Sequence, residues 1–359
     1  MVNKHINQLD VFRGLAALSV CAVHFTYDSF FHNYFAQGLF VQLFFTLSGF
    51  VIAYNYHDTL KNFRDFSQFG IKRFKRLYPL HLFFLLLFLL IEILKYFVKL
   101  KYEINLNNQP FEVNNFKNFF LNLFFIQHFA NEYNFNSPSW SISVEMMLYL
   151  CFGMMLASIK KSLLYYLCLF YVTFFIIFLN KSYGSSLSIS AFYSGLYSFS
   201  IGYLFFLLFK KKNINHYLKG KIYLDVVFYA FIVIFLFELF YFNFIKQKYI
   251  YSLIFGIIFF SSCFLNKKFF LFKIFFNDFF IFLGKISYSI YMSHLLIFFL
   301  FDNTLKYLIK FQTKINSFGN IVVDLNNFEA NFFTILIYMF TILFSKFTYE
   351  NVEMRFYKK

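Results

Sequence analysis

Charged residues are scarce in this chain. Of its 359 residues, 14% are Asp, Glu, Lys or Arg and 60% are hydrophobic, whereas a soluble protein of this length carries nearly twice that charge. An ordinary soluble globular protein is therefore excluded, and the composition indicates a polytopic membrane protein. The short alternating segments of an outer-membrane barrel are missing as well, because the apolar runs last about 20 residues.

Cysteine is also sparse, and its placement argues against two kinds of site. The four cysteines stand singly inside apolar runs, and no two of them have the spacing of metal ligands. We therefore expect neither a disulfide framework nor a bound metal ion. The four residues are Cys21, Cys151, Cys168 and Cys263.

Acidic residues are outnumbered by basic ones, 17 to 33, which gives a net charge of +16. In a soluble protein such a charge would indicate a nucleic-acid partner. Here the lysines and arginines cluster between apolar runs, where membrane topology and anionic lipid account for most of them. We expect membrane lipid and no nucleic acid among the partners, and the sequence does not fix an oligomeric state.

The apolar runs predict an all-α fold, a polytopic bundle of about ten transmembrane helices in one domain of residues 1–359. A further apolar piece, 118–130, is shorter than the roughly 20 residues that a spanning helix needs, so we expect a re-entrant or interfacial helix there. The ten predicted spans are 9–30, 38–56, 77–98, 141–158, 162–179, 190–209, 222–243, 249–265, 286–303 and 329–348.

The distribution of basic residues predicts that both termini are cytoplasmic. With ten spans in this orientation, roughly two thirds of the 33 Lys and Arg residues lie inside, as the positive-inside rule requires. The longest outside stretches are then about 99–140 and 304–328. They are long enough to shape a binding site for a substrate but too short to form a separate enzyme domain.

Three ionisable groups lie in the first apolar run: Asp10, Arg13 and His24. Eleven residues separate Arg13 from His24, about three turns plus 20°, so both side chains share one face and lie roughly 16 Å apart along the axis. If the run is the first span, His24 lies near mid-bilayer, where ionisable groups are costly and mark a polar cavity or pathway. A buried histidine that only pins helix packing fits the run equally well.

A basic cluster, IKRFKRLYPLH, precedes the third predicted span. Arg73 and Arg76 are three residues apart and therefore neighbours on one helical face, and Tyr78 follows where the chain enters the bilayer. Paired guanidinium groups suit phosphate or pyrophosphate, because each planar fork donates two hydrogen bonds to an anion. Topology and lipid head groups would also require basic residues here, so both interpretations stay open.

The stretch NSPSWSISVEMMLYL contains the only tryptophan of the chain, Trp140, and a carboxylate five residues further on, Glu145. Ser141, Glu145 and Tyr149 are spaced four apart and form one polar stripe. Glu145 lies below the outer interface, where it needs a partner or water. It could orient a histidine, accept a proton from a sugar hydroxyl or balance a buried arginine. Alternatively, Trp140 anchors the interface and Glu145 is half of a structural ion pair.

The run LGKISYSIYMSHLLIF places Tyr291 and His294 one helical turn apart. Counted from Lys285 on the inside, His294 lies roughly 13 Å deep, close to the depth expected for His24. The two histidines could line one cavity or pack apart. Two further intramembrane acids, Glu92 and Glu238, have no motif context, and we assign them no role.

Six stretches of this chain resemble, in order and approximate spacing, the acyltransferase-3 family of membrane O-acyltransferases. The resemblance covers nearly the whole chain. It implies about ten membrane helices and transfer of an acyl group, most often acetyl, from cytoplasmic acyl-coenzyme A to a hydroxyl of a glycan or another acceptor. The six stretches are LDVFRGLAALSVCAVHF, FFTLSGFVIAY, RFKRLYPL, SWSISVEMMLYL, ISYSIYMSHLLIF and ENVEMRF.

The resemblance also implies roles for individual residues. Arg13 and His24 correspond to the family's arginine–ten–histidine pair, and Arg73 and Arg76 to its coenzyme-facing arginines. Glu145 belongs to its tryptophan–serine–glutamate motif. One departure concerns the last stretch: the family has proline two residues after the terminal glutamate, whereas Met354 and Arg355 follow Glu353 here. No appended hydrolase-like domain is present in this sequence, so we expect a stand-alone version of the family.

We therefore expect a membrane-bound acyltransferase in the bacterial inner (cytoplasmic) membrane that O-acetylates a cell-envelope glycan with acetyl-CoA. His24 would be the general base or a transient acyl carrier. The alternative is a transporter or flippase of a polar lipid or sugar, which would also have intramembrane histidines and a basic inner face. The predicted catalytic residues are His24, Glu145 and His294, and the predicted acetyl-CoA contacts are Arg13, Arg73, Arg76 and Tyr78.

Overall fold

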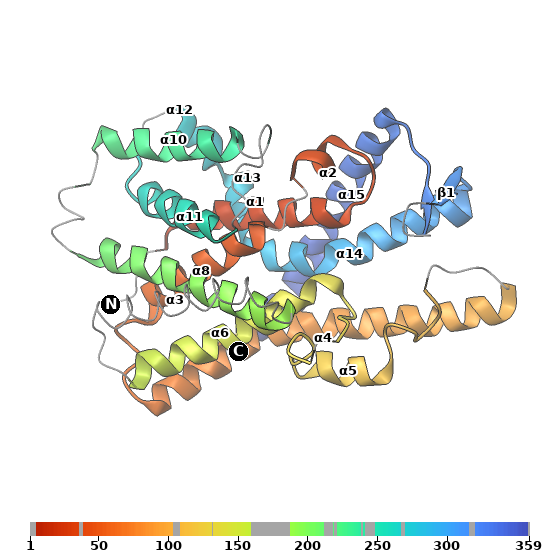
Figure 1. Ribbon diagram of the computed structural model, residues 1–359, viewed down its shortest axis with the longest axis horizontal. Helices are drawn as coiled ribbons and strands as arrows, with labels where there is room; N and C mark the ends of the chain where they lie inside the picture. Colours follow the sequence, from red (N-terminus) through yellow and green to blue (C-terminus); the bar gives the residue numbers. More distant parts are fainter. Residues whose placement is uncertain are drawn as a thin grey trace. The chain divides into compact units, whose positions relative to one another are not determined.

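The described part of the chain is almost entirely helical, and a two-stranded sheet is its only β-structure (Figure 1). The predicted all-α fold is confirmed in this coarse form. The predicted span 162–179, together with Glu238 and Cys168, lies outside the described residues. The computed structural model describes residues 5–35, 39–102, 108–130, 132–158, 187–211, 218, 221–237, 240, 248–266, 270–315 and 320–357.

Helices occupy the places of the other nine predicted spans. Several of these helices begin and end within one residue of the predicted bounds, among them those at 39–56, 140–158 and 287–303, whereas the helix at 63–102 extends well beyond the predicted 77–98. In chain order the elements are α1 (Asn7–His24), α2 (Phe30–Phe35), α3 (Leu39–Tyr56), α4 (Phe63–Tyr102), α5 (Phe116–Leu123), η1 (Ser137–Ser139), α6 (Trp140–Ser158), α8 (Leu187–Lys210), α10 (Ile222–Phe237), α11 (Lys248–Ser262), α12 (Phe270–Phe275), α13 (Asp278–Lys285), α14 (Ser287–Asn303), η3 (Thr304–Ile309), β1 (Thr313–Ile315), β2 (Ile321–Val323), α15 (Asn327–Thr348), η4 (Tyr349–Glu353) and α16 (Met354–Tyr357).

Five described helices are long and apolar enough to cross a membrane, and a sixth span results if 272–285 and 287–309 are counted together. The chain is therefore an integral membrane protein, while the count of ten spans and the cytoplasmic termini stay predictions. The five helices are Leu39–Tyr56, Phe63–Tyr102, Ser137–Ala157, Ser190–Lys210 and Asn327–Phe356.

The third predicted span is the later part of a much longer helix. α4 runs for 40 residues and includes the whole basic cluster. It begins after Asn62, whose side-chain oxygen accepts a hydrogen bond from the Asp65 backbone N–H at 3.0 Å. It also continues through Pro79, although proline removes one hydrogen bond of the helical ladder. Arg73 and Arg76 are therefore on one helix, as their spacing predicted.

The short apolar piece 118–130 contains α5, which has eight residues and is too short to span a bilayer. Asn115 caps its first turn by accepting a hydrogen bond from the Asn118 backbone N–H. Asn118 and Asn122 are buried, whereas Phe116 and Phe120 are exposed. An exposed phenylalanine face on so short a helix agrees with the interfacial or re-entrant helix predicted here.

The described residues group into two compact units, each built from three separate ranges. Unit 1 comprises 1–17, 37–73 and 144–287, and unit 2 comprises 18–36, 74–143 and 288–359. The boundaries fall inside α1, α4 and α6, so these helices contribute residues to both. The contacts within each unit are described below.

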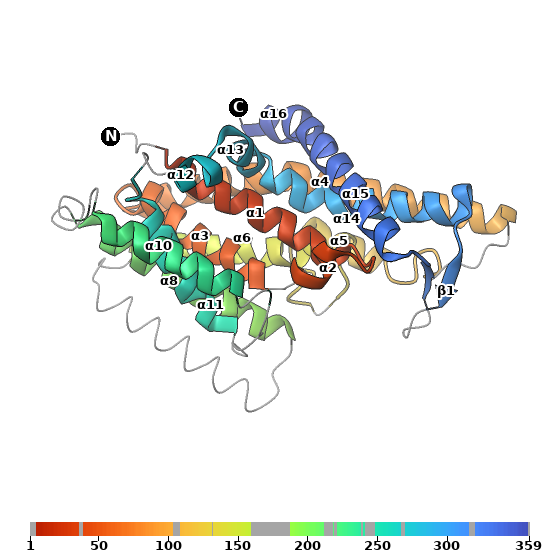
Figure 2. The same cartoon turned by 90° about the horizontal axis from the view of Figure 1, so that it is seen from above.

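In unit 1, α3 packs against α8, α11 packs against both, and α10 packs against α11 (Figures 1 and 2). Glycine allows the closest approach: a Cβ at Gly49 of α3 would lie 2.0 Å from the backbone oxygen of Phe199 in α8. Polar side chains add to this packing, because Ser198 hydrogen-bonds Gln42 at 2.5 Å and Ser252 at 2.8 Å. Small residues and interhelical hydrogen bonds of this kind are typical of helix packing in membranes.

In unit 2, α14 and α15 share a hydrogen bond between Ser293 and Ser345 at 2.8 Å. The Tyr338 hydroxyl of α15 donates to the Leu18 carbonyl of α1 at 2.9 Å. Beyond η3, β1 and β2 form an antiparallel hairpin, which the sequence did not predict and which lies in the expected outside stretch 304–328. The next helix, α15, starts with a reciprocal capping box between Asn326 and Glu329.

Candidate functional site

The Arg73 guanidinium of unit 1 lies among aromatic rings. Its Nη2 donates to the Tyr56 hydroxyl at 2.8 Å, and its Cζ lies 5.1 Å from the centre of the Tyr56 ring, 5.7 Å from that of Phe69 and 5.8 Å from that of Tyr149. Arg73 is 8% exposed, and its Nε has no hydrogen-bond partner in the described ranges. Within the described part of the chain, no carboxylate forms an ion pair with it.

Glu145 belongs to the same unit and reaches Arg73 only indirectly. Its Oε1 accepts hydrogen bonds from Ser48 at 2.9 Å and from the hydroxyl of Tyr149, whose ring lies beside the guanidinium. The predicted polar stripe thus holds for Glu145 and Tyr149. Both donors engage Oε1, and no ion pair joins this carboxylate to Arg73, so among the described residues the positive charge of Arg73 has no direct counter-ion. Such a group can bind an anion with the guanidinium's planar fork.

His24 and His294 lie together in unit 2, which decides between the two arrangements that the sequence left open. Their ring centres are 5.2 Å apart, with 43° between the ring planes. His294 is fully buried, whereas His24 at the end of α1 is partly exposed. Two imidazoles in contact at the end of a helix are suited to proton transfer.

The protonation of His294 follows from its neighbours. Its Nδ1 lies 3.2 Å from the Ile290 carbonyl, which can only accept a hydrogen bond, so this nitrogen carries the proton. In the neutral ring Nε2 then has a free lone pair, and this buried atom has no hydrogen-bond partner among the residues that the structure describes. An unpaired polar atom at such a depth is costly, which is typical of a site that binds something.

Tyr291 fixes the helix turn that carries His294. Its hydroxyl lies 2.6 Å from Ser141 Oγ and donates to the Pro138 carbonyl at 2.9 Å. In addition, the Asn136 amide donates to the Met292 carbonyl at 2.8 Å. The chain before α6 is thereby tied to α14, and Ser141 serves Tyr291 rather than the stripe with Glu145. Spacing along one helix could not identify this partner on another.

Arg76, unlike Arg73, has a carboxylate nearby. Its positive charge acts on Glu353 of η4, which is buried and accepts a hydrogen bond from Ser289 Oγ at 3.0 Å. Arg76, Ser289 and Glu353 come from three of the six stretches that resemble the family. They lie together here although the proline that the family has after the glutamate is replaced. Tyr78 lies one turn further along, stacked on Phe74 with ring centres 4.4 Å apart.

Arg13 is also paired. Its Nη1 lies 3.0 Å from Asp10 Oδ1, and the other carboxylate oxygen of Asp10 contacts His5. Asp10 is almost fully buried. The arginine of the first run thus has a counter-ion on its own helix, one turn earlier.

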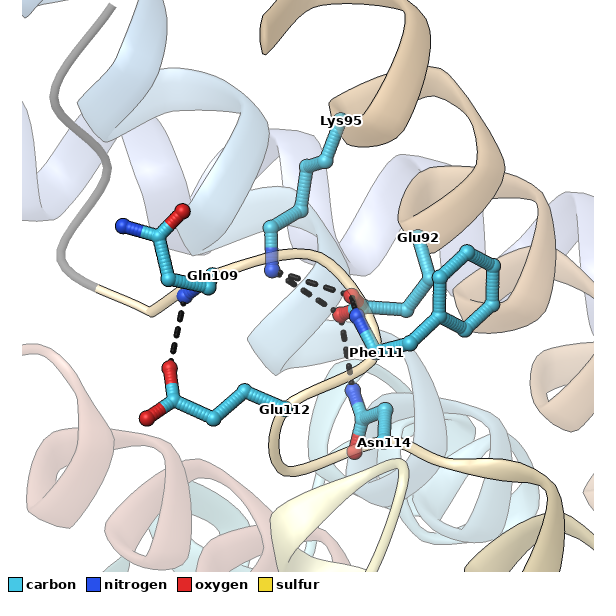
Figure 3. Close-up of polar contacts among 6 residues, drawn as sticks. All are labelled: Glu92, Lys95, Gln109, Phe111, Glu112 and Asn114. Atoms are coloured by element: carbon cyan, nitrogen blue, oxygen red, sulfur yellow. Dashed lines mark hydrogen bonds and ion pairs between the residues drawn. The ribbon is translucent and has the colours of Figure 1, made fainter.

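Glu92, to which we assign no role from its sequence context, anchors a loop of unit 2 (Figure 3). Lys95 contacts both carboxylate oxygens at 3.0 and 3.1 Å. The Phe111 backbone N–H and the Asn114 amide each donate to the same carboxylate at 3.0 Å. Phe111 itself has a positive φ of 60°, a conformation that is uncommon for a bulky residue. Glu92 therefore fixes the start of the predicted outside stretch against α4.

The fold and these buried ionisable groups define a class: a helical integral membrane protein whose polar residues gather in a few interior clusters. A more specific assignment comes from comparison with known families. The acyltransferase-domain model of the acyltransferase-3 family matches residues 6–349, nearly the whole chain. The chain belongs to this family, and it is a membrane acyltransferase. No curated protein and no solved structure matches it.

Proposed function

We propose that this protein transfers an acetyl group from cytoplasmic acetyl-CoA to a hydroxyl of a cell-envelope glycan in the bacterial inner membrane, with both termini in the cytoplasm. The phosphate-binding role falls to Arg73, and the acyl-transfer role to His24. The observation that carries the proposal is the state of Arg73, a buried guanidinium that has no counter-ion among the described residues.

A buried charge without a partner is expensive, and proteins retain one where a ligand supplies the opposite charge. Acetyl-CoA brings phosphate groups, whose geometry suits the two-pronged hydrogen bonding of a guanidinium. Exposed Lys72 and Lys75 flank Arg73 on α4 and add attraction for an anion. Arg13 already has the carboxylate of Asp10 as its counter-ion, and Arg76 lies within electrostatic reach of the Glu353 carboxyl, so we assign them and Tyr78 a smaller share of the binding.

The acyl-transfer step can be written with the neutral imidazole of His24. The ring accepts the proton of the acceptor hydroxyl while the oxygen attacks the thioester carbonyl. The new C–O bond forms, the C–S bond breaks, and the proton passes to the departing thiolate. A transient acyl-histidine would divide the same exchange into two steps. The free Nε2 of His294 would accept a hydrogen bond from the ring of His24 and so fix its tautomer, or would take up the proton that His24 receives. Glu145 would position Tyr149 beside Arg73.

The test combines donor binding and transfer. We expect Arg73→Ala to weaken acetyl-CoA binding at least about tenfold in isothermal titration of the purified protein, since a charge-assisted bidentate contact is lost. Arg64→Ala is the matched control, because it removes an exposed guanidinium from the same helix. Equal affinities of the two variants would contradict the phosphate site.

Transfer is measured as radiolabel that passes from acetyl-CoA to glycan in membranes. His24→Ala should lower it at least about 100-fold, the usual size of a general-base effect. His32→Ala removes another histidine of unit 2, one whose Nδ1 hydrogen-bonds the Ala22 carbonyl at 2.9 Å, and should leave transfer intact. Full labelling by a well-expressed His24→Ala protein would reject the catalytic role. Movement of glycan without any label would favour the transporter alternative.

A further inference from the structure

A second polar cluster of unit 2 lies at the far end of α14, around Asp302. The Tyr27 hydroxyl donates to Asp302 Oδ1 at 3.2 Å, and Lys306 Nζ lies 2.6 Å from Oδ2. The same ammonium group donates to the Ile321 carbonyl of β2 at 2.7 Å. The side chain of Asp302 is 17% exposed and that of Lys306 is 8% exposed. We call Tyr27, Asp302 and Lys306 the Asp302 cluster.

The Asp302 cluster is connected to the two histidines by a row of packed rings. Phe25 lies 6.2 Å from His294 and 5.6 Å from Phe298, and Phe298 lies 5.3 Å from Tyr27, all between ring centres. Asp302 follows His294 by eight residues, roughly 12 Å along the helix axis. Tyr27 follows His24 by three residues. A row of contacting rings, of which Phe25 and His294 are fully buried, therefore links the Asp302 cluster to the imidazoles.

The helix changes its winding within this cluster. α14 ends at Asn303 and continues as the π-helix η3, so the ion pair from Asp302 to Lys306 crosses the change. Segments of π-helix are rare and frequently mark functional sites. The hairpin of β1 and β2 follows η3 directly (Figures 1 and 2), and its carbonyl contact with Lys306 holds the lysine in place.

The chemistry of the cluster fits a ligand rich in hydroxyl groups. A carboxylate can accept about four hydrogen bonds, and Tyr27 and Lys306 occupy one lone pair on each oxygen of Asp302. Exposed Thr26 and Asp28 flank Tyr27 and add further polar groups. A few placed polar groups beside aromatic rings form the usual lining of a small-molecule site.

We propose that the Asp302 cluster binds the hydroxyl groups of the acceptor sugar and presents one of them to His24. This inference rests on the proposed function, because it supplies the acceptor side of the same reaction. Lys306 and Tyr27 hold the carboxylate in position, and the free lone pairs of Asp302 accept hydrogen bonds from the sugar. The cluster follows the predicted ninth span on its outer side, where a cell-envelope glycan would arrive.

The experiment uses the purified full-length protein in detergent, with labelled acetyl-CoA as donor. The acceptor probe is a detergent extract of envelope glycan from cells that lack this protein, added over a range of concentrations. We expect Asp302→Asn to raise the half-saturating amount of extract at least about tenfold, since a hydrogen bond to a charged group is lost or weakened. Its affinity for acetyl-CoA should stay within about twofold of the unmodified protein. Asp324→Asn, which breaks the exposed ion pair with Lys314 on the hairpin, is the matched control and should change neither value.

Two results would overturn the cluster's role while leaving the proposed function standing. One is an unchanged half-saturating amount for Asp302→Asn. The other is an equal loss of acetyl-CoA affinity and acceptor use, which a structural ion pair would produce. If Asp302→Asn is not recovered from membranes, Tyr27→Phe decides the question, because it keeps the ring and should still raise the half-saturating amount about threefold. Absence of any transfer by the unmodified protein would instead reject the proposed function, and the acceptor site with it.

Discussion

Buried charges in the described residues are of two kinds: those that have an ion-pair partner and those that do not. Asp10 and Glu92 have partners on their own helices, at Arg13 and Lys95. Arg73 has rings and one hydroxyl around it but no ion pair among the described residues. An ion pair neutralises a buried charge, whereas the guanidinium of Arg73 still requires an anion to neutralise it. The two arginines three residues apart on α4 are therefore not equivalent, although their spacing alone makes them look so.

Glu92 allows a prediction about a purely structural pair. In Glu92→Gln the Lys95 ammonium loses its counter-ion, and the contacts to Phe111 and Asn114 are weakened. We expect a loss of about 3 kcal/mol, the cost of breaking one side of a buried ion pair, seen as a lower Tm of the purified protein in detergent.

The matched control for this variant is Glu112→Gln. Glu112 is exposed and accepts one hydrogen bond from the Gln109 backbone N–H at 2.8 Å, in the same loop (Figure 3). Its substitution should cost less than about 1 kcal/mol. A Tm of Glu92→Gln as high as that of Glu112→Gln would show that the loop is held by other contacts. Acetyl-CoA affinity should be the same in both, since neither residue is assigned to the donor.

At the scale of the helices, the contact between α3 and α8 depends on two glycines. A Cβ at Gly202 would lie 1.9 Å from the Thr46 carbonyl oxygen, and one at Gly49 would lie 2.0 Å from that of Phe199. Neither oxygen can move without shifting a helix. We therefore expect Gly49→Ala to destabilise the protein by about 3 kcal/mol, at the upper end of overpacking effects, as measured by thermal unfolding in detergent.

Gly70→Ala on α4 is the comparison variant. The nearest atom to its added Cβ is Leu150 Cδ2 at 3.6 Å, an ordinary van der Waals distance. Because alanine favours a helix interior over glycine, this variant should be neutral or more stable by up to about 1 kcal/mol. If both alanine variants unfold at the same temperature, close approach at Gly49 is not what holds the two helices together.

Most helices could be predicted from the apolar runs, because a chain segment in lipid must pair its own backbone polar groups, and an α-helix does so. The extension of α4 back to Phe63 could not, since the basic cluster is too polar to count as part of a span. The β1–β2 hairpin could not be predicted either, because its strands have three residues each, too few to show the alternation of a β-strand. Contacts between helices, such as that of Tyr291 with Ser141, could not be predicted for another reason. Spacing places a residue on a face of its own helix but does not say which helix lies opposite.

At the scale of the whole chain, the candidate site was predicted by residue identity rather than by geometry. The resemblance named His24 and Arg73, but it gave neither the approach of His294 to His24 nor the lack of a counter-ion at Arg73. Both depend on which side chains face one another across helices. The Asp302 cluster could not be found either, since Tyr27 and Asp302 are 275 residues apart in sequence. Residue types thus indicated the chemistry, whereas the structure was needed to show which of these residues contact one another.

The orientation of the chain in the membrane is the remaining prediction at this scale. The ten-span topology places the basic cluster of α4 inside and the β1–β2 hairpin outside, with an odd number of spans between them. Lys72 and Lys314 are exposed at these two places and can each be replaced by cysteine in a chain whose native cysteines are changed to serine. A membrane-impermeant maleimide should then label Lys314→Cys in intact cells and Lys72→Cys only after permeabilisation. The positive-inside bias is the physical reason, because translocating the basic cluster is unfavourable. Labelling of both positions from the same side would require an even number of spans between them and would show that the ten-span prediction is wrong.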